Sequence, residues 1–255
     1  MNLVKAIYDQ MLSQQETHER KQHWYPSGIG AEVDGVHIGK CKRALYYDLT
    51  RAERTNPMDA VALFKCNVGD LIHNYLDSLL AKHLESEGYE NLGAEIPVVW
   101  NAEGIEFPFS GRMDYLFKAP NGDLVGVEWK STYGRGFDTI KKNGVKIENL
   151  IQCCCYLEQT VQPLSKILLL YVGRDNGYII GFIVSKDERG LKIERMGTSE
   201  VTYCPLRFIH IIESCKIVEQ CVKESILPKM DFKEKDWQCS YCSYHDRCKG
   251  EPDDN

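Results

Sequence analysis

Helices and strands are expected to alternate along this 255-residue sequence, which predicts an α/β or α+β sandwich around a mixed sheet. A long helical pattern covers 57–86, and β-branched and aromatic runs follow between 96 and 130. A second series of helix and strands covers 146–184. Apolar residues make up 43% of the chain, which excludes disordered and collagen-like architectures.

The expected helices begin and end at capping residues. For the helix at 57–86, Asn56 is the expected N-cap, Pro57 suits the first position and Gly88 ends it. Its apolar stripe is Val61, Phe64, Val68, Leu71, Tyr75 and Leu79. Other helices are expected within the first 25 residues, at 146–161 and at 205–226. Strands are expected at 96–100, 105–109, 112–118, 123–130, 167–172 and 178–184.

Charge and hydropathy exclude several classes of protein. The net charge of −6 excludes a broadly basic nucleic-acid coat but allows a local basic channel. No run approaches the ~20 apolar residues of a membrane-spanning helix, and the polar N-terminus is not a signal peptide. A cytoplasmic protein of a bacterial, archaeal or phage-infected cell is therefore expected, with no membrane partner. The sequence also lacks a P-loop, so any motor would be a separate protein.

A carboxylate and an amine share one face of the strand at 123–130. Side chains alternate along a strand, so Val125, Val127 and Trp129 face one way while Glu128 and Lys130 face the other. Two carboxylates that lie close together repel each other and need a cation when they are buried. Their oxygen atoms favour Mg²⁺ or Mn²⁺, and a nearby lysine can stabilise a developing anion, which suits phosphodiester hydrolysis. The alternative is an exposed cross-strand salt bridge.

The turn at 119–123 decides whether Asp114 joins this pair. A three-residue loop with a type I turn and a glycine bulge at Gly122 would set Asp114 opposite Glu128. A two-residue Asn-Gly turn would instead set Asp114 opposite Trp129 and turn it away. The turn chemistry agrees with a site only in the first register.

Two helical pairs complete the pattern. Gln152 and Tyr156 are i,i+4 neighbours whose polar ends could reach the site, and His73 shares a helix face with Gly69. Together, Gly69-x3-His73, Asp114, Glu128-x-Lys130 and Gln152-x3-Tyr156 resemble the PD-(D/E)xK nucleases of the RecB-like branch. One departure is Met113, where the family has a proline before the aspartate.

The resemblance implies a restriction-endonuclease-like core with a mixed sheet flanked by helices, at about 57–200 of a single domain spanning 1–255. It also implies that Mg²⁺ or Mn²⁺ is bound by His73, Asp114, Glu128 and the carbonyl of Trp129. Lys130 would assist the attacking water. Gln152 and Tyr156 would position Lys130 and DNA.

Eleven cysteines without a signal peptide are a poor disulfide framework. Cys239-x2-Cys242-x5-Cys248 has the spacing of a metal or cluster site that needs a fourth ligand. The candidates are Cys41, Cys66, Cys153, Cys154, Cys155, Cys204, Cys215, Cys221 and His245. Residues 153–155 point three ways on a helix and cannot all bind one metal, so they are expected to be small buried residues, as are Cys66, Cys204, Cys215 and Cys221.

Cys41-x-Arg43 followed by tyrosine resembles the N-terminal cysteine site of the CRISPR-associated iron–sulfur exonucleases and their helicase-linked relatives. This resemblance, over about 28–250, implies a [4Fe–4S] cluster held by Cys41, Cys239, Cys242 and Cys248. The cluster would join segments at about 28–50 and 202–250. A zinc site is the alternative, but a single distant thiol favours a cluster. A separate helicase or CRISPR adaptation proteins are possible partners.

Basic and aromatic residues suggest how DNA could be held. The candidate phosphate contacts are Arg43, Arg135, Lys141, Lys142 and Lys146. The candidate stacking residues, which favour single strands or DNA ends, are Tyr46, Tyr47, Tyr133 and Phe137. The sequence thus predicts a metal-dependent DNA exonuclease acting on single strands or ends. The alternatives are a non-cleaving DNA-binding or assembly subunit, and a zinc-stapled nuclease acting on RNA.

Overall fold

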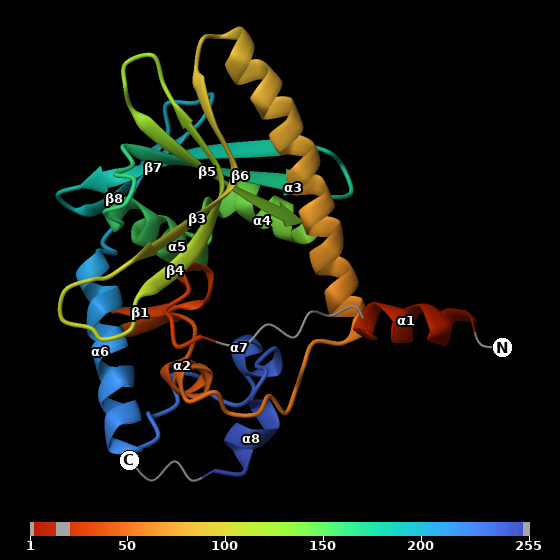
Figure 1. Cartoon of the computed structure of the whole chain (residues 1–255), viewed down its shortest axis with the longest axis vertical. Helices are drawn as coiled ribbons and strands as arrows, with labels where there is room; N and C mark the ends of the chain where they lie inside the picture. Colours follow the sequence, from red (N-terminus) through yellow and green to blue (C-terminus); the bar gives the residue numbers. More distant parts are fainter. Residues whose placement is uncertain (1–2, 14–20, 252–255) are drawn as a thin grey trace.

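The computed structural model describes residues 3–13 and 21–251, and it contains one large mixed sheet flanked by helices (Figure 1). The strands are β1 (Gly30–Val33), β2 (Val36–Gly39), β3 (Glu90–Trp100), β4 (Phe109–Lys118), β5 (Leu124–Thr132), β6 (Lys166–Gly173), β7 (Ile179–Asp187), β8 (Gly190–Arg195) and β9 (Val201–Cys204). The helices are α1 (Leu3–Ser13), α2 (Lys42–Leu49), α3 (Ala60–Ser86), α4 (Gly134–Asn143), α5 (Ile147–Glu158), α6 (Phe208–Glu224), α7 (Trp237–Ser240) and α8 (His245–Lys249), with a 3₁₀ turn at Pro26–Gly28.

The sheet contains seven strands in the order β3-β4-β5-β6-β7-β8-β9. Only β5 and β6 run parallel within it, and the remaining neighbours are antiparallel. Strands β1 and β2 form a separate hairpin. The predicted α/β class with a mixed sheet flanked by helices is confirmed. Within the described residues, no helix is long and apolar enough to cross a membrane.

The hairpin of β4 and β5 has the register that its turn chemistry predicts. The N–H of Ala119 donates to the carbonyl of Asp123 across 2.8 Å, and Gly122 has a positive φ of 91°. The ladder runs from Lys118 opposite Leu124 to Tyr115 opposite Val127. Continuing the ladder by one pair sets Asp114 opposite Glu128, so the predicted register is confirmed.

Helix α3 differs from its prediction at its start and in its buried face. Asp59, not Asn56, is the N-cap, because its carboxylate accepts the Ala62 N–H across 2.7 Å. The predicted apolar stripe faces outward, and Leu71 on it is 68% exposed. The helix carries a second apolar stripe, and that one packs on the sheet: Ile72, Leu76, Leu80 and Leu84. Periodicity finds apolar faces but does not choose between two of them.

The strand predicted at 105–109 is wrong, because β4 begins only at Phe109. The main-chain N–H groups of Glu106 and Phe107 donate to the buried carboxylate of Glu219, at 2.8 and 3.0 Å, instead of to a strand. The sequence also did not predict α2, α4, α7, α8, β1, β2, β8 and β9. Of the helix expected in the first 25 residues, α1 covers Leu3–Ser13, and 14–20 lie outside the described residues.

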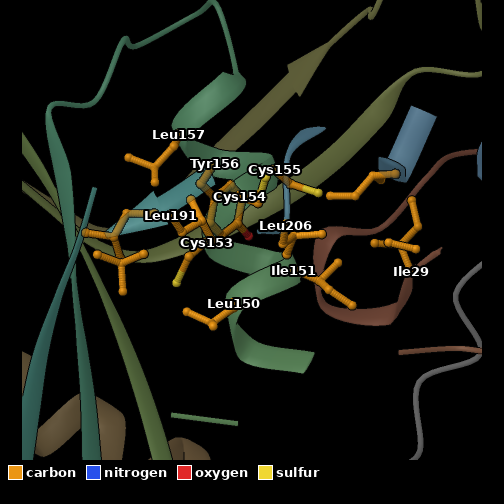
Figure 2. Packing of buried hydrophobic residues seen from close by; sticks show 14 of the residues in the cluster. Ile29, Leu150, Ile151, Cys153, Cys154, Cys155, Tyr156, Leu157, Leu191 and Leu206 are labelled. Atoms are coloured by element: carbon orange, nitrogen blue, oxygen red, sulfur yellow. The ribbon is translucent and has the colours of Figure 1, made fainter. Parts of the chain in front are cut away.

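The sheet separates two apolar cores. On the α3 side, Val125, Val127 and Trp129 pack together, which confirms the predicted alternation along β5. On the other side α5 packs with the cysteines at 153–155, all of them buried and pointing in different directions (Figure 2). These three, like Cys215, are small core residues as expected. The same expectation is wrong for Cys66, which is exposed, and holds only in part for the half-buried Cys204 and Cys221.

Candidate active site

The ladder between β4 and β5 ends at the position of the predicted site. One residue beyond its last pair, Asp114 Oδ2 accepts the main-chain N–H of Trp129 across 2.7 Å. The N–H and C=O of one residue in a strand point to the same side, so the Trp129 carbonyl is also directed toward β4. A carboxylate and a carbonyl oxygen are therefore available on the same side of β5.

Glu128, Lys130 and Gln152 form a closed polar triangle. Glu128 is only 1% exposed, and its Oε2 accepts from Lys130 Nζ at 3.1 Å and from Gln152 Nε2 at 2.9 Å. Gln152 Oε1 in turn accepts from Lys130 Nζ at 2.8 Å. Gln152 comes from α5, so the helix reaches the end of β5 as the i,i+4 pattern anticipated.

Burial sets the charge balance of this triangle. Burial raises the pKa of Glu128 to about 8, although Lys130 works in the opposite direction. Burial also lowers the pKa of Lys130, but the neighbouring Glu128 and Asp114 carboxylates outweigh it, and the net shift is upward. Lys130 therefore stays an ammonium, while Glu128 mostly keeps its proton near pH 7 and would lose it when a further cation binds beside it.

His73 lies on α3 and faces Asp114 of β4. Its Nδ1 is 3.9 Å from Asp114 Oδ2, and its pKa is lowered, chiefly by burial. The imidazole is therefore neutral near pH 7, which is the form that binds metals. Both His73 Nε2 and Glu128 Oε1 are buried without a hydrogen-bond partner among the described residues.

These residues suit a hard divalent ion by their chemistry. Two carboxyl groups and a carbonyl offer the oxygen ligands that Mg²⁺ and Mn²⁺ prefer, the imidazole nitrogen suits the transition metal Mn²⁺ better than Mg²⁺, and an ion would satisfy two orphaned atoms. Within 3–13 and 21–251, however, no three His, Cys, Asp or Glu side chains are already placed to hold a metal ion. His73, Asp114 and Glu128 would have to draw closer together on binding.

Tyr156 is placed differently from Gln152. Its hydroxyl donates to the carbonyl of Arg112 at 3.0 Å and accepts the Arg112 N–H at 3.2 Å, so it braces β4. A Cβ at Gly111 would lie 2.8 Å from this hydroxyl, so glycine is what lets the tyrosine approach. Tyr156 therefore acts on the strand that carries Asp114, and the predicted contact with Lys130 is not among its hydrogen bonds.

Gly69 allows a close approach by the protein itself. A Cβ there would lie 3.1 Å from the guanidinium of Arg174 and 3.3 Å from the hydroxyl of Ser131. Arg174 donates to Ser131 Oγ and to the carbonyl of Lys65, which joins β5, the end of β6 and α3. Sequence analysis missed Arg174, which directly follows β6 and lies two residues beyond the predicted strand at 167–172.

Asp77 is the second missed residue. It is buried, it accepts the indole N–H of Trp129 across 2.7 Å, and burial raises its pKa to about 6. The available signal was its spacing of four residues from His73, which places both on one helix face.

The profile of the PD-(D/E)XK nuclease superfamily matches residues 37–249 of this sequence. The chain belongs to the PD-(D/E)XK nuclease superfamily. Membership indicates a nuclease, and such nucleases generally use divalent metals such as Mg²⁺ or Mn²⁺. The crystal structure of SSO0001 is similar in fold, with a TM-score of 0.56 at 16% identity over 98% of this chain and 97% of that one. No curated protein matches the sequence.

A second candidate site is a cavity of about 710 Å³ whose lining includes Cys41, Cys239, Cys242 and Cys248. Cys41 is the N-cap of α2, and the others lie in and between α7 and α8. Burial raises the pKa of Cys41 to about 11, so this thiol is protonated unless it binds a metal. Four thiols around one cavity have the donor chemistry of an iron–sulfur cluster or of zinc.

Hydrogen bonds join the two segments that carry these cysteines. The N–H of Lys42 donates to Asp231 Oδ2 at 2.6 Å, and the hydroxyl of Tyr244 donates to Asp48 Oδ1 at 2.7 Å. The N–H of Asn56 donates to the carbonyl of Ser243 at 2.9 Å. The two segments therefore contact each other directly.

The predicted DNA contacts divide into two groups. Arg43 is only 2% exposed, its Nε donates to the carbonyl of Pro228 at 2.8 Å, and its Nη1 is 3.8 Å from Cys248 Sγ. Its prediction as a phosphate contact is wrong, because it supports the cysteine segment instead. Tyr47 and Phe137 are buried and cannot stack on bases. The exposed members are Tyr133, Arg135, Lys141, Lys142 and Lys146, all near α4.

Proposed function

We propose that this PD-(D/E)XK protein is a divalent-metal-dependent DNA nuclease, an exonuclease on single strands or DNA ends, with a structural [4Fe–4S] cluster. The observation that carries the nuclease proposal is the triangle of Glu128, Lys130 and Gln152. In it an ammonium lies beside a buried carboxyl group that keeps one oxygen without a partner. Asp114 follows in register on the neighbouring strand.

Each residue of the site has a proposed role. His73, Asp114, Glu128 and the Trp129 carbonyl would hold the ion, which supplies a more acidic bound water and neutralises phosphate charge. Lys130 stabilises the negative charge that develops on the attacked phosphate or on the water. Gln152 holds the Lys130 ammonium in place, and Tyr156 holds the strand that carries Asp114.

DNA is proposed to reach the site past α4. The exposed cations Arg135, Lys141, Lys142 and Lys146 follow β5 directly in the chain, so phosphates bound there lead to the end of that strand. Tyr133 is exposed between β5 and α4, and its ring could stack on an unpaired base. This favours single strands or frayed ends.

The cluster is proposed to be held by Cys41, Cys239, Cys242 and Cys248. The support is that all four line one cavity although Cys41 is far from the others in sequence. Joining the two segments closes a very long loop, which as a cross-link would stabilise the fold by roughly 5 kcal/mol. The role is structural, as in the iron–sulfur exonucleases that the sequence resembles.

The nuclease proposal is tested by digestion with Mn²⁺. Wild-type protein is expected to degrade end-labelled single-stranded DNA and DNA ends, and Glu128→Gln to bind DNA without degrading it. Glu219→Gln is the matched control, because Glu219 is another buried carboxylate that accepts hydrogen bonds away from the site. Binding without cleavage by the wild type would indicate the non-cleaving subunit, and cleavage of RNA alone would indicate the third alternative.

A further inference from the structure

Trp129 lies between the two charged residues of the Glu-x-Lys pattern, and both its main chain and its side chain donate a hydrogen bond. Its main-chain N–H donates to Asp114 Oδ2, and its indole N–H donates to Asp77 Oδ1, each across 2.7 Å. The indole packs on the α3 side of the sheet, whereas Glu128 and Lys130 face α5. One residue therefore connects the strand that carries the site to helix α3.

Asp77 closes this connection into a ring. It is one turn beyond His73 on α3, so both side chains reach the sheet from the same face of the helix. His73 Nδ1 is 3.9 Å from Asp114 Oδ2, and Asp114 accepts from Trp129. The ring runs from Asp77 to Trp129, to Asp114, to His73 and back along the helix.

The carboxylate of Asp77 is the acceptor that the buried indole N–H of Trp129 needs. Asp77 is buried on α3, the helix whose Leu76 and Leu80 pack on the apolar core, and a leucine in its place would leave the buried indole N–H without an acceptor. A carboxylate that accepts an N–H fixes the direction of its donor, which apolar contact alone does not. The bond sets the rotation of the indole and the distance of α3 from β5.

We propose that Asp77 is a positioning residue for the metal site, acting through Trp129 to set the spacing of His73 from Asp114 and the direction of the Trp129 carbonyl. The proposal rests on the proposed nuclease function and adds a residue outside the pattern by which the family was recognised. Asp77 itself would contact neither the ion nor DNA.

Two variants of Asp77 separate hydrogen bonding from packing. Asp77→Asn keeps an oxygen that accepts the indole N–H, and Asp77→Leu removes the acceptor and keeps similar volume. Trp129→Phe removes the donor and keeps an aromatic ring. Tyr115→Phe is the matched control. It removes a hydrogen bond to Asn91 from the same apolar core and leaves the circuit of Asp77, Trp129, Asp114 and His73 unchanged.

The measurements are Mn²⁺ affinity by calorimetry without DNA, thermal stability, and kcat and KM with single-stranded DNA. Asp77→Asn is expected to bind Mn²⁺ like the wild type. Asp77→Leu and Trp129→Phe are each expected to weaken Mn²⁺ binding about 10- to 100-fold and to lower kcat more than they raise KM. The double variant should be no worse than either single one, because both remove the same bond. Tyr115→Phe should change stability only.

The outcomes separate the two proposals. Wild-type protein that binds no Mn²⁺ and cleaves no DNA overturns the nuclease function, and the role of Asp77 with it. Wild-type protein that binds Mn²⁺, with Asp77→Leu binding it equally well, overturns the role of Asp77 alone. The same conclusion follows if Asp77→Asn is as defective as Asp77→Leu, or if Tyr115→Phe weakens Mn²⁺ binding as much.

Discussion

Gln152 Nε2 donates to Glu128 Oε2 across 2.9 Å, from a helix on one face of the sheet to the end of a strand within it. The same amide accepts from Lys130, so one neutral side chain holds both charged residues of the pattern. Because an amide offers a donor and an acceptor at fixed geometry, no apolar residue can replace this function.

Replacing Gln152 by Leu should therefore release Lys130 and leave Glu128 with one partner fewer. Cleavage with Mn²⁺ is expected to fall about 10- to 100-fold, while DNA affinity stays nearly unchanged. Single-turnover cleavage and DNA binding in Ca²⁺ measure the two effects. Gln159→Leu is the control, because Gln159 is also buried but binds Gln162 at the end of α5. Equal losses in both variants would mean that Gln152 only stabilises the helix.

Lys130→Ala should separate the chemical step from metal binding. Asp114→Ala and Glu128→Ala remove proposed ligands, so Mn²⁺ binding and cleavage should be lost together. Lys130→Ala should keep most of the Mn²⁺ affinity yet reduce single-turnover cleavage by on the order of 10²–10³, as for loss of one electrostatic group. Cleavage by Lys130→Ala at the wild-type rate would show that the site is misassigned.

The cysteine-lined cavity predicts a coloured protein. Anaerobically purified wild type should be brown with broad absorption near ~400 nm, as thiolate-bound iron–sulfur clusters are. Cys239→Ser should lose the colour, the iron and much of the thermal stability. Cys154→Ser, in the core of α5, and Cys66→Ser, on the surface, should both keep the colour. Stoichiometric zinc without iron would support the zinc alternative instead.

Stability should depend on pH through His37, which lies on β2 four residues before Cys41 and is not a proposed ligand. Its Nε2 lies 2.9 Å from the carbonyl of Lys40, so Nε2 carries the proton, and Nδ1 accepts from Lys42 Nζ at 3.2 Å. Burial lowers the pKa of His37, and Lys42 adds to this, although Asp231 opposes it. The fold therefore favours the neutral imidazole, and protonation costs stability.

The lowered pKa of His37 sets the direction in which stability changes with pH. The stabilisation from neutral His37 is fully present above the ordinary pKa of 6.5 and is lost as pH falls through the lower pKa of the folded state. The melting temperature of the wild type should therefore drop more between about pH 7 and about pH 5 than that of His37→Gln, which keeps a donor for Lys40 but cannot titrate. Parallel curves for the two proteins would contradict this assignment.

The two groups of basic residues should respond differently to alanine substitution. Arg135, Lys141 and Lys142 are exposed, so removing each should weaken DNA binding and reduce the slope of log affinity against log salt by about 1. Arg43→Ala should instead lower the melting temperature, because it removes the donor to the Pro228 carbonyl and leaves a buried gap. A salt slope altered by Arg43→Ala alone would restore its role at the DNA.

Local rules were sufficient to predict the centre of the site. The alternation along β5 and the chemistry of a three-residue turn involve neighbours in sequence, so Glu128, Lys130 and the register of Asp114 could be derived before the structure. The expected reach of Gln152 was also met, because α5 is buried over residues 150–157 and brings this side chain to Glu128 and Lys130. Positions governed by nearby residues are the ones that a sequence specifies by itself.

Tertiary packing decided the rest. Helix α3 has two apolar faces, and only the sheet selected the one with Ile72 and Leu76. The N–H groups at 106–107 donate to Glu219 on α6, more than one hundred residues away. These residues therefore do not form the strand that their sequence favours. Buried Arg43 donates to the carbonyl of Pro228, and Asp77 accepts from Trp129 only when α3 packs on the sheet. Each depends on a partner far away in the chain, which no local pattern encodes.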